Sequence, residues 1–217
     1  TNRIVMLFGA TGSVGDGLLK AAIEDPDVEK IYVITRRDSA RIRGGVASGK
    51  VDMRMHKDFT DYHSLADVLA GVDTVLWGLG TSSLSVDEPT YTKIHVDFPV
   101  SFMKAWLSAK KKLANKRPMS FHFVTGMGTD GDAHWAQQKR YTEIKLADMA
   151  EGTPLRTFSY RSAFIRPTSE QANVGHYVLE ALIRPGYLAI PAIELGRSML
   201  EISARTEELP NGTLIDA

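Results

Sequence analysis

The stretch IVMLFGATGSVGDG, residues 4–17, sets an apolar run directly before four glycines. A short apolar run that ends at glycine predicts a buried strand. Gly9 would permit a tight turn, Gly12 would let a ligand approach the backbone, and Gly15 would let the next helix lie close to the strand. The free N–H groups at the start of such a helix bind phosphate. The stretch therefore predicts the phosphate-binding turn of a dinucleotide fold, although a purely structural turn has the same composition.

Short apolar runs alternate with longer amphipathic runs along the rest of the chain. We expect strands at residues 4–8, 31–35, 51–55, 74–77, 121–125 and 156–160. We expect helices at residues 14–23, 63–69, 91–113, 139–149 and 173–183, and an exposed loop at 36–50. Because parallel strands need crossover connections, this alternation predicts an α/β, doubly wound (Rossmann), mostly parallel sheet with helices on both faces. Residues 1–217 should form a single domain, with 168–217 as a small C-terminal substrate-side cap.

The composition narrows the classes of partner. The 217 residues carry 26 Lys and Arg against 26 Asp and Glu, so the net charge offers no long-range attraction for nucleic acid. The absence of cysteine excludes disulfides and thiolate chemistry. The six histidines show no metal-ligand spacing, and no apolar run is long enough to span a membrane. We therefore expect a soluble, cytoplasmic monomer or homodimer that acts on a small-molecule substrate without nucleic acid, membrane or metal.

The end of the second expected strand predicts the cofactor. A carboxylate at this place binds a free ribose 2′-hydroxyl, whereas arginine suits a 2′-phosphate. The sequence has Thr35, Arg36 and Arg37 there, and Asp38 comes one position too late for the ribose. Arg36 and Arg37 therefore favour NADP over NAD, unless the segment is an ordinary charged loop.

Tyr141 and Lys145 are the catalytic candidates. Four residues apart on one helix, their side chains would emerge side by side. The ammonium of Lys145 would then lower the pKa of the Tyr141 phenol and make it a better proton donor. The same spacing also arises by chance, as a surface tyrosine beside a solvated lysine.

The order of several short motifs resembles a known family. GATGSVG at Gly9, TRRD at Thr35, DFTD at Asp58, GLGTS at Gly78, VTGMG at Val124, YTEIK at Tyr141 and IRP at Ile165 occur in the order typical of atypical short-chain dehydrogenases/reductases. The nearest branch is similar to the small reductases related to Tat-interacting oxidoreductase, followed by the NmrA-like proteins. The resemblance covers nearly the whole chain.

This resemblance implies an NADP-binding Rossmann fold in which Tyr141 transfers the proton and Lys145 orients the nicotinamide ribose. It implies that Asp58 and Phe59 lie near the adenine and that the segment around Arg166 passes near the nicotinamide. The full set of expected cofactor-binding residues is Gly9, Thr11, Gly12, Ser13, Val14, Gly15, Arg36, Arg37, Asp58, Phe59, Gly78, Leu79, Gly80, Thr81, Lys145 and Arg166.

One departure from the family concerns the hydroxyl that polarises the substrate carbonyl. The family has a serine pair after the fifth strand, whereas this chain reads Thr125 and Gly126. Thr125 would take the role, or Thr129 would reach in from the loop, or the polarisation is weak or absent. His134 and Trp135 would form a wall of the substrate site or anchor their loop on the core.

The leading hypothesis is an NADPH-dependent reductase of a small carbonyl or related compound, with Tyr141, Lys145 and Thr125 as its catalytic residues. An NmrA-like regulator that binds NADP without turnover is the first alternative, which the missing serine favours and an intact Tyr141 disfavours. The second alternative is a redox-neutral isomerase or cyclase on the same fold.

Overall fold

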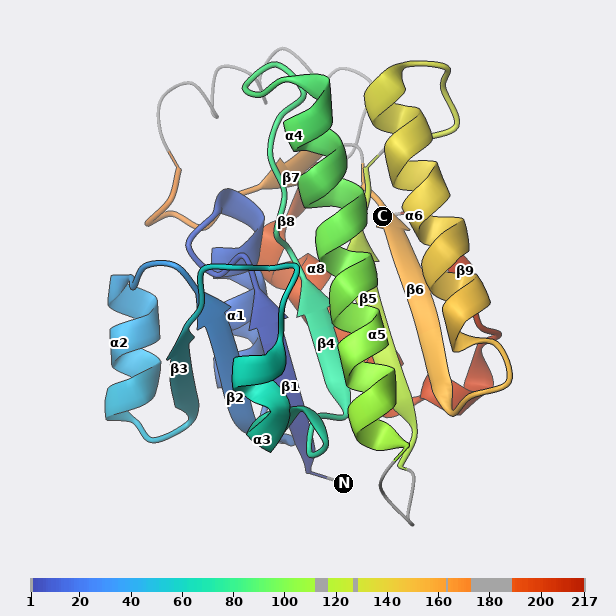
Figure 1. Ribbon diagram of the computed structural model, residues 1–217. Helices are drawn as coiled ribbons and strands as arrows, with labels where there is room; N and C mark the ends of the chain where they lie inside the picture. The colour runs from blue at the N-terminus through green and yellow to red at the C-terminus, as the bar shows by residue number, and fades with distance from the viewer. Residues whose placement is uncertain (1, 112–116, 127–128, 163, 173–188, 217) are drawn as a thin grey trace.

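Seven parallel strands form the central sheet of the computed structural model, which describes residues 2–111, 117–126, 129–162, 164–172 and 189–216 (Figure 1). They are β1 (Arg3–Phe8), β2 (Val28–Thr35), β3 (Val51–Met55), β4 (Thr74–Trp77), β5 (Met119–Val124), β6 (Leu155–Arg161) and β9 (Thr213–Asp216). Their order is β3-β2-β1-β4-β5-β6-β9, with every pair parallel. The expected α/β class is confirmed. Because the order reverses between β1 and β4, a ligand crevice is expected at the carboxyl ends of these two strands.

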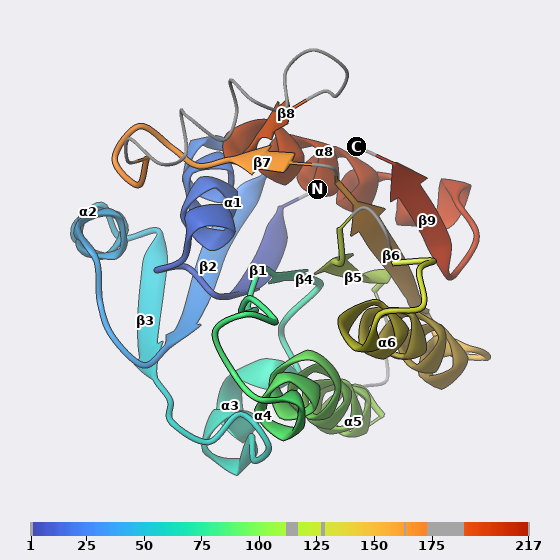
Figure 2. The ribbon, with the colours of Figure 1, turned by 90° about the horizontal axis from the view of Figure 1, so that it is seen from above.

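Helices cover both faces of this sheet (Figure 2). One layer contains α1 (Ser13–Glu24), α2 (Ala40–Ala47) and α8 (Ala192–Ala204). The other contains a 3₁₀ turn (His63–Leu65), α3 (Ala66–Leu69), α4 (Glu88–Thr92), a π-helical turn (Lys93–Asp97), α5 (Phe98–Lys110) and α6 (His134–Ala150). A two-stranded parallel ribbon of β7 (Phe164–Arg166) and β8 (Ala189–Pro191) and a 3₁₀ turn (Thr206–Glu208) complete the described elements.

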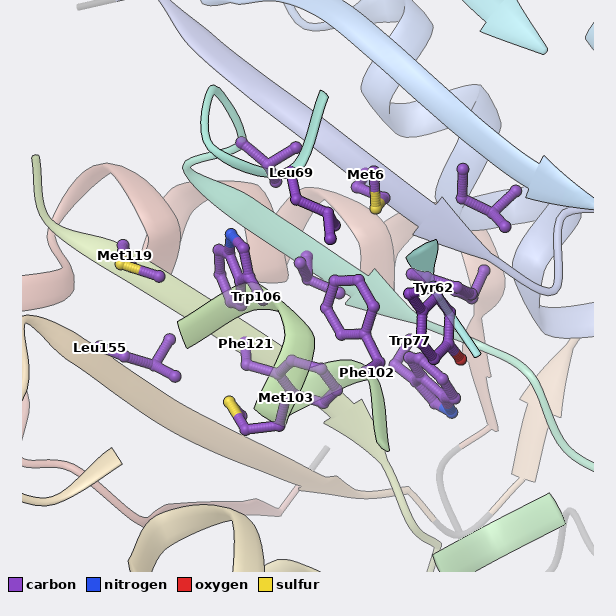
Figure 3. Close-up of a cluster of buried hydrophobic side chains, with 14 of the residues drawn as sticks. Met6, Tyr62, Leu69, Trp77, Phe102, Met103, Trp106, Met119, Phe121 and Leu155 are labelled. Atoms are coloured by element: carbon purple, nitrogen blue, oxygen red, sulfur yellow. The ribbon is translucent and has the colours of Figure 1, made fainter. Parts of the chain in front are cut away.

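The core has two parts because side chains alternate across each strand. In β1, Val5 and Leu7 pack toward α1 and α8, whereas Met6 and Phe8 pack toward α5. The α5 side is rich in aromatic rings (Figure 3), and Phe8 stacks on Trp77 with ring centroids 4.3 Å apart. These rings fix the carboxyl ends of β1 and β4, from which the glycine-rich segments of the crevice depart.

Residues 36–50 correct the first expectation, because they do not form a loop throughout. Ala40–Ala47 is helix α2. Ser39 caps it, since its hydroxyl accepts a hydrogen bond from the backbone N–H of Ile42 at 3.3 Å. Ile42 is fully buried against the α1 side of the core. One buried apolar side chain in eight residues, two of which are glycines, gave too weak a periodicity to indicate the helix.

The described part of the C-terminal region belongs to the sheet and its helical layer. Helix α8 lies against α1 (Figure 2), and its Leu195 and Met199 are fully buried. Strand β9 extends the sheet beside β6, with Phe158 paired with Thr213. These contacts hold residues 192–216 on the main core, and the substrate-side cap expected at 168–217 stays a prediction. The helix expected at residues 173–183 lies outside the described residues.

Candidate functional site

Two adjoining clefts lie at the carboxyl ends of the strands, where the strand order reverses. The outer cleft has a volume of about 320 Å³ and is lined by Gly9, Thr11, Ile34, Thr35, Arg36, Arg37, Phe59 and Leu79. The inner cleft has a volume of about 430 Å³ and is lined by Gly12, Ser13, Val14, Gly78, Leu79, Gly80, Thr81, Ser82, His95, Val124, Thr125, Gly126, Lys139, Ser162, Phe164 and Ile165. Leu79 lines both. The clefts therefore meet above β1 and β4, beside the first turn of α1.

The glycine turn between β1 and α1 has the form that the sequence predicts. Gly9 has a φ of +83°, a left-handed conformation that favours glycine. A Cβ at Gly15 would stand 1.8 Å from the carbonyl oxygen of Gly9, so only glycine fits there. Gly12 caps α1 without a side-chain hydrogen bond. The first N–H groups of an α-helix have no partner within the helix, so those of Ser13 and Val14 are available to a ligand in the inner cleft.

The outer cleft has two exposed arginines at its rim. Arg36 and Arg37 follow β2 directly, and Nε of Arg37 donates a hydrogen bond to the Thr11 hydroxyl at 3.3 Å. Phe59, which is 3% exposed, forms an apolar wall. The cleft thus has a flat apolar surface next to two cations.

Asp58 lies in the turn just before this wall, outside the cleft lining. Its carboxylate accepts hydrogen bonds from the backbone N–H and the hydroxyl of Thr60, at 2.9 and 2.6 Å. These bonds lower the pKa of Asp58. The side chain of Asp58 therefore stabilises its own turn. Of the two residues that the resemblance places near the adenine, only Phe59 lines the outer cleft.

His95 enters the inner cleft from the π-helical turn between α4 and α5, and sequence reasoning missed it. Its Nε2 lies 3.0 Å from the carbonyl oxygen and 3.2 Å from the backbone nitrogen of Thr81, so the tautomer of the ring decides whether it donates to the first or accepts from the second. A Cβ at Gly80 would stand 3.0 Å from the imidazole Cε1, so the β4 loop lies tightly over the ring. Burial and the nearby Lys139 lower the pKa of His95 to about 4, so the ring is neutral at physiological pH. Such π-helical turns often occur at functional sites.

Lys139, which is half-buried, brings an amine into the same cleft from α6. Its ammonium donates a hydrogen bond to the carbonyl oxygen of Thr125. Burial lowers its pKa to about 8, and the charge of Glu143 offsets this only partly. Arg161 already binds both oxygens of Glu143, at 2.6 and 3.1 Å. Lys139 is therefore an amine whose two protonation states are both populated near neutral pH.

The two hydroxyls expected at the substrate carbonyl both donate to the backbone. The Thr125 hydroxyl donates to the carbonyl oxygen of Tyr160 at 3.3 Å, although the residue lines the inner cleft. The Thr129 hydroxyl donates to the carbonyl oxygen of Gly126 at 2.6 Å. Ser162, which sequence reasoning missed, also lines the cleft, and its buried hydroxyl has no hydrogen-bond partner among the described residues. No motif in the sequence marks Ser162, because it lies between β6 and β7.

Tyr141 and Lys145 are not brought to either cleft. Tyr141 is 55% exposed on α6. Because it follows Lys139 by two residues, it lies about 200° around the helix from it. Lys145 is half-buried and lies outside the cleft linings. Trp135 precedes Lys139 by four residues, the spacing that separates Tyr141 from Lys145. The centroid of its ring lies 5.8 Å from Nζ of Lys139.

Some of the remaining expected residues line the inner cleft, and others lie outside it. Gly78, Leu79, Gly80 and Thr81 line the inner cleft as expected. Arg166 ends β7 and is half-buried outside the cleft linings, whereas its neighbour Ile165 lines the inner cleft. His134 and Trp135 belong to the first turn of α6 and not to a loop.

Two further properties concern the described residues as a whole. None of their helices is long and apolar enough to cross a membrane. Within the same residues, no group of three or more His, Asp and Glu side chains is placed to hold a metal ion.

Comparison with known sequences gives distant likenesses. No protein-family model matches the chain. The chain is 28% identical over 109 residues to leucinostatins biosynthesis cluster protein T of Purpureocillium lilacinum, which covers 49% of this chain and 39% of that protein. It is 27% identical over 160 residues to a hybrid PKS-NRPS synthetase of Penicillium citrinum, covering 69% of this chain and 4% of the synthetase. The chain thus spans less than half the length of these curated relatives.

Solved structures are similar over the whole chain. A 3-oxoacyl-[acyl-carrier protein] reductase from Brucella melitensis, in complex with NAD, has a TM-score of 0.69 and 16% identity, covering 100% of this chain and 95% of that one. An oxidoreductase of the short-chain dehydrogenase/reductase family from Burkholderia thailandensis has a TM-score of 0.70 and 16% identity, covering 100% and 91%. At this identity the likeness concerns the fold. The chain has a Rossmann-type fold, which it shares with these enzymes.

Proposed function

We propose that the chain is an NADP(H)-dependent oxidoreductase that reduces a small carbonyl compound. One observation carries the proposal: the two joined clefts lead from the arginine pair Arg36 and Arg37, past the open N-terminus of α1, to the amine of Lys139. This order of cation pair, free N–H groups and ionisable group matches the order of the 2′-phosphate, pyrophosphate and nicotinamide in the cofactor. The reductases of similar fold support the proposal.

The residues present fit the cofactor. Because Gly15 has no Cβ, the turn can pass close to Gly9. The backbone N–H groups of Ser13 and Val14, at the start of α1, would bind the pyrophosphate. Arg36 and Arg37 would bind the 2′-phosphate through charge-assisted hydrogen bonds, and Phe59 would cover the adenine. When bound, a nicotinamide cofactor supplies hydride-transfer chemistry.

Lys139 is the chain's own proton donor in this proposal, in place of Tyr141. Its pKa of about 8 means that the ammonium form predominates at pH 7 yet releases its proton readily. The carbonyl of Thr125 holds Nζ in place, and neutral His95 adds no competing positive charge. The ammonium would give its proton to the carbonyl oxygen of the substrate as that oxygen gains negative charge. The amine then recovers a proton from water.

Cofactor titration tests the proposal. NADPH and NADH are titrated separately while the tryptophan fluorescence of the protein is followed, to which Trp135 beside Lys139 contributes. We expect NADPH to bind more tightly than NADH. The double variant Arg36→Ala/Arg37→Ala should lose at least about 100-fold in NADPH affinity, with little change for NADH, because two charge-assisted hydrogen bonds of about 1.5–3 kcal/mol each together contribute about 3 kcal/mol or more.

Arg43→Ala is the matched control, since Arg43 is an exposed arginine of α2 that pairs with Asp38 at 3.0 Å and lies outside both clefts. Its NADPH affinity should equal that of the unmodified chain. If neither NADPH nor NADH binds, the glycine turn has only a structural role and the proposal is wrong.

A non-enzymatic NADP-binding regulator is the second candidate. The observation that favours it is that an indole, that of Trp135, and not a phenol precedes Lys139 by four residues, because indole cannot donate a proton at neutral pH. A regulator would bind one redox state of the cofactor more tightly and would consume none of it across a panel of aldehydes and ketones. Consumption of NADPH with any member of that panel excludes this candidate.

A further inference from the structure

Two lysines of the described residues, the buried Lys110 and the half-buried Lys139, differ in their surroundings. Nζ of Lys110 lies 3.9 Å from the carboxylate of Asp73, below the amino ends of the strands. Nζ of Lys139 bonds to a backbone carbonyl, and the nearby carboxylate of Glu143 is occupied by Arg161. Burial lowers the pKa of both amines. Only Lys139, of the two, lines a cleft large enough for a small molecule.

The cleft also gives a small molecule access to Nζ of Lys139. A Cβ added at Gly126 would stand 3.8 Å from Nζ, which is ordinary contact distance, so the glycine leaves that side of the amine open. Phe164 and Ile165 provide apolar cleft walls. A short apolar chain that carries one polar reactive carbon suits this combination of surfaces.

From this geometry we infer that Lys139 captures small aliphatic aldehydes covalently, as an imine on Nζ. This site goes beyond the proposed function and needs no bound cofactor. The reaction uses the neutral amine, whereas the proposed proton donation uses the ammonium form of the same group. Buried lysines with little charge stabilisation are the ones that form such bonds.

The chemistry balances without a further reactant. The lone pair of Nζ forms a bond to the carbonyl carbon, and the electron pair of the C=O bond moves to oxygen, which takes up a proton. A second proton converts the hydroxyl of the resulting carbinolamine into water, which leaves. The lone pair of nitrogen then forms the C=N bond, and nitrogen has by the end released both of its protons to solvent. One amine and one aldehyde thus give one imine and one water, with no oxidation or reduction.

The test maps which lysine of the unmodified chain reacts with butanal. The protein is incubated with butanal and cyanoborohydride, which reduces each imine to a stable butyl amine, and the labelled residues are identified by peptide mass spectrometry. At pH 7.5 we expect Lys139 to be labelled at least about tenfold faster than Lys145, which lines neither cleft, because burial lowers the pKa of Lys139 to about 8 and leaves more of its amine neutral. The selectivity should fall as the pH rises to 10, where surface amines also lose their protons.

Two variants and a parallel measurement of NADPH binding show whether Lys139 is the reactive lysine, independently of the proposed function. Lys139→Arg should lose the fast labelling, and Lys110→Arg should retain it. Labelling of Lys139 no faster than Lys145 in the unmodified chain overturns the inference, whether or not NADPH binds. Fast labelling of Lys139 in a protein that binds no NADPH would support the inference while removing the proposed function, so the two failures are distinguishable.

Discussion

Helix α6 presents two faces that differ in what they contact. One face carries Lys139 into the inner cleft and Leu146 into the core. The other face holds Tyr141 and Ile144 in solvent, 55% and 56% exposed. Both faces contain an aromatic residue followed four positions later by lysine, at 135 and 139 and again at 141 and 145. A four-residue spacing therefore identifies a shared helix face, but not whether that face meets a cleft.

The largest expected effect compares the two lysines of these pairs. Lys139→Met should lower kcat for carbonyl reduction by about 10²- to 10⁴-fold, the usual contribution of a general acid. Lys145→Met should leave kcat within about twofold, because Lys145 lines neither cleft. Steady-state kinetics with NADPH and one responsive aldehyde measures both. A larger loss of kcat for Lys145→Met than for Lys139→Met would return the catalytic role to Tyr141 and Lys145.

The second effect concerns the stability that each face contributes. Leu146 is 1% exposed, so Leu146→Ala should lower the free energy of unfolding by about 2–5 kcal/mol. Ile144→Ala should change the same free energy by less than about 0.5 kcal/mol, because Ile144 is 56% exposed. Urea denaturation followed by circular dichroism measures both variants. A larger loss for Ile144→Ala would mean that this exposed face is covered by a partner in solution.

The third effect is the pH dependence of turnover. The proton donor must be protonated, and the pKa of Lys139 is lowered to about 8. With saturating NADPH, kcat/KM for the carbonyl substrate should therefore be constant at lower pH and fall about tenfold for each pH unit above 8. A profile that stays flat to pH 9.5 would show that Lys139 is not the group that donates the proton.

The smallest effect is expected from the phenol on the outer face. Tyr141→Phe should leave kcat and NADPH affinity within about twofold of the unmodified chain, because Tyr141 is exposed and lies outside both clefts. The same kinetic assay measures it. A loss of turnover with intact NADPH binding would restore Tyr141 as the proton donor.

The backbone of the site could be predicted from the sequence because local features determine it. Gly9, Gly12 and Gly15 lie between a fully apolar strand and a helix, and the structure places them in the expected turn. The position of Arg36 and Arg37 follows directly from the end of β2. Six of the seven strands of the sheet were likewise predicted from short segments rich in apolar residues.

The side chains of the inner cleft could not be predicted in the same way, because they depend on how helices pack. The rotation of α6 about its axis is set by buried residues such as Thr142, whose hydroxyl donates to the carbonyl oxygen of His95 at 2.8 Å. That contact joins residues 47 positions apart. His95 itself reaches the cleft through a π-helical turn, which has no sequence pattern of its own. Lys139 therefore looked like an ordinary position in a helical pattern.

A crystal structure with NADP⁺ bound would test most directly which face of α6 serves the cofactor. We expect the 2′-phosphate beside Arg36 and Arg37, the pyrophosphate on the N–H groups of Ser13 and Val14, and the nicotinamide end in the inner cleft next to Lys139. Contact of the nicotinamide or its ribose with Tyr141 and Lys145, or binding of the cofactor outside both clefts, would contradict the assignment of Lys139.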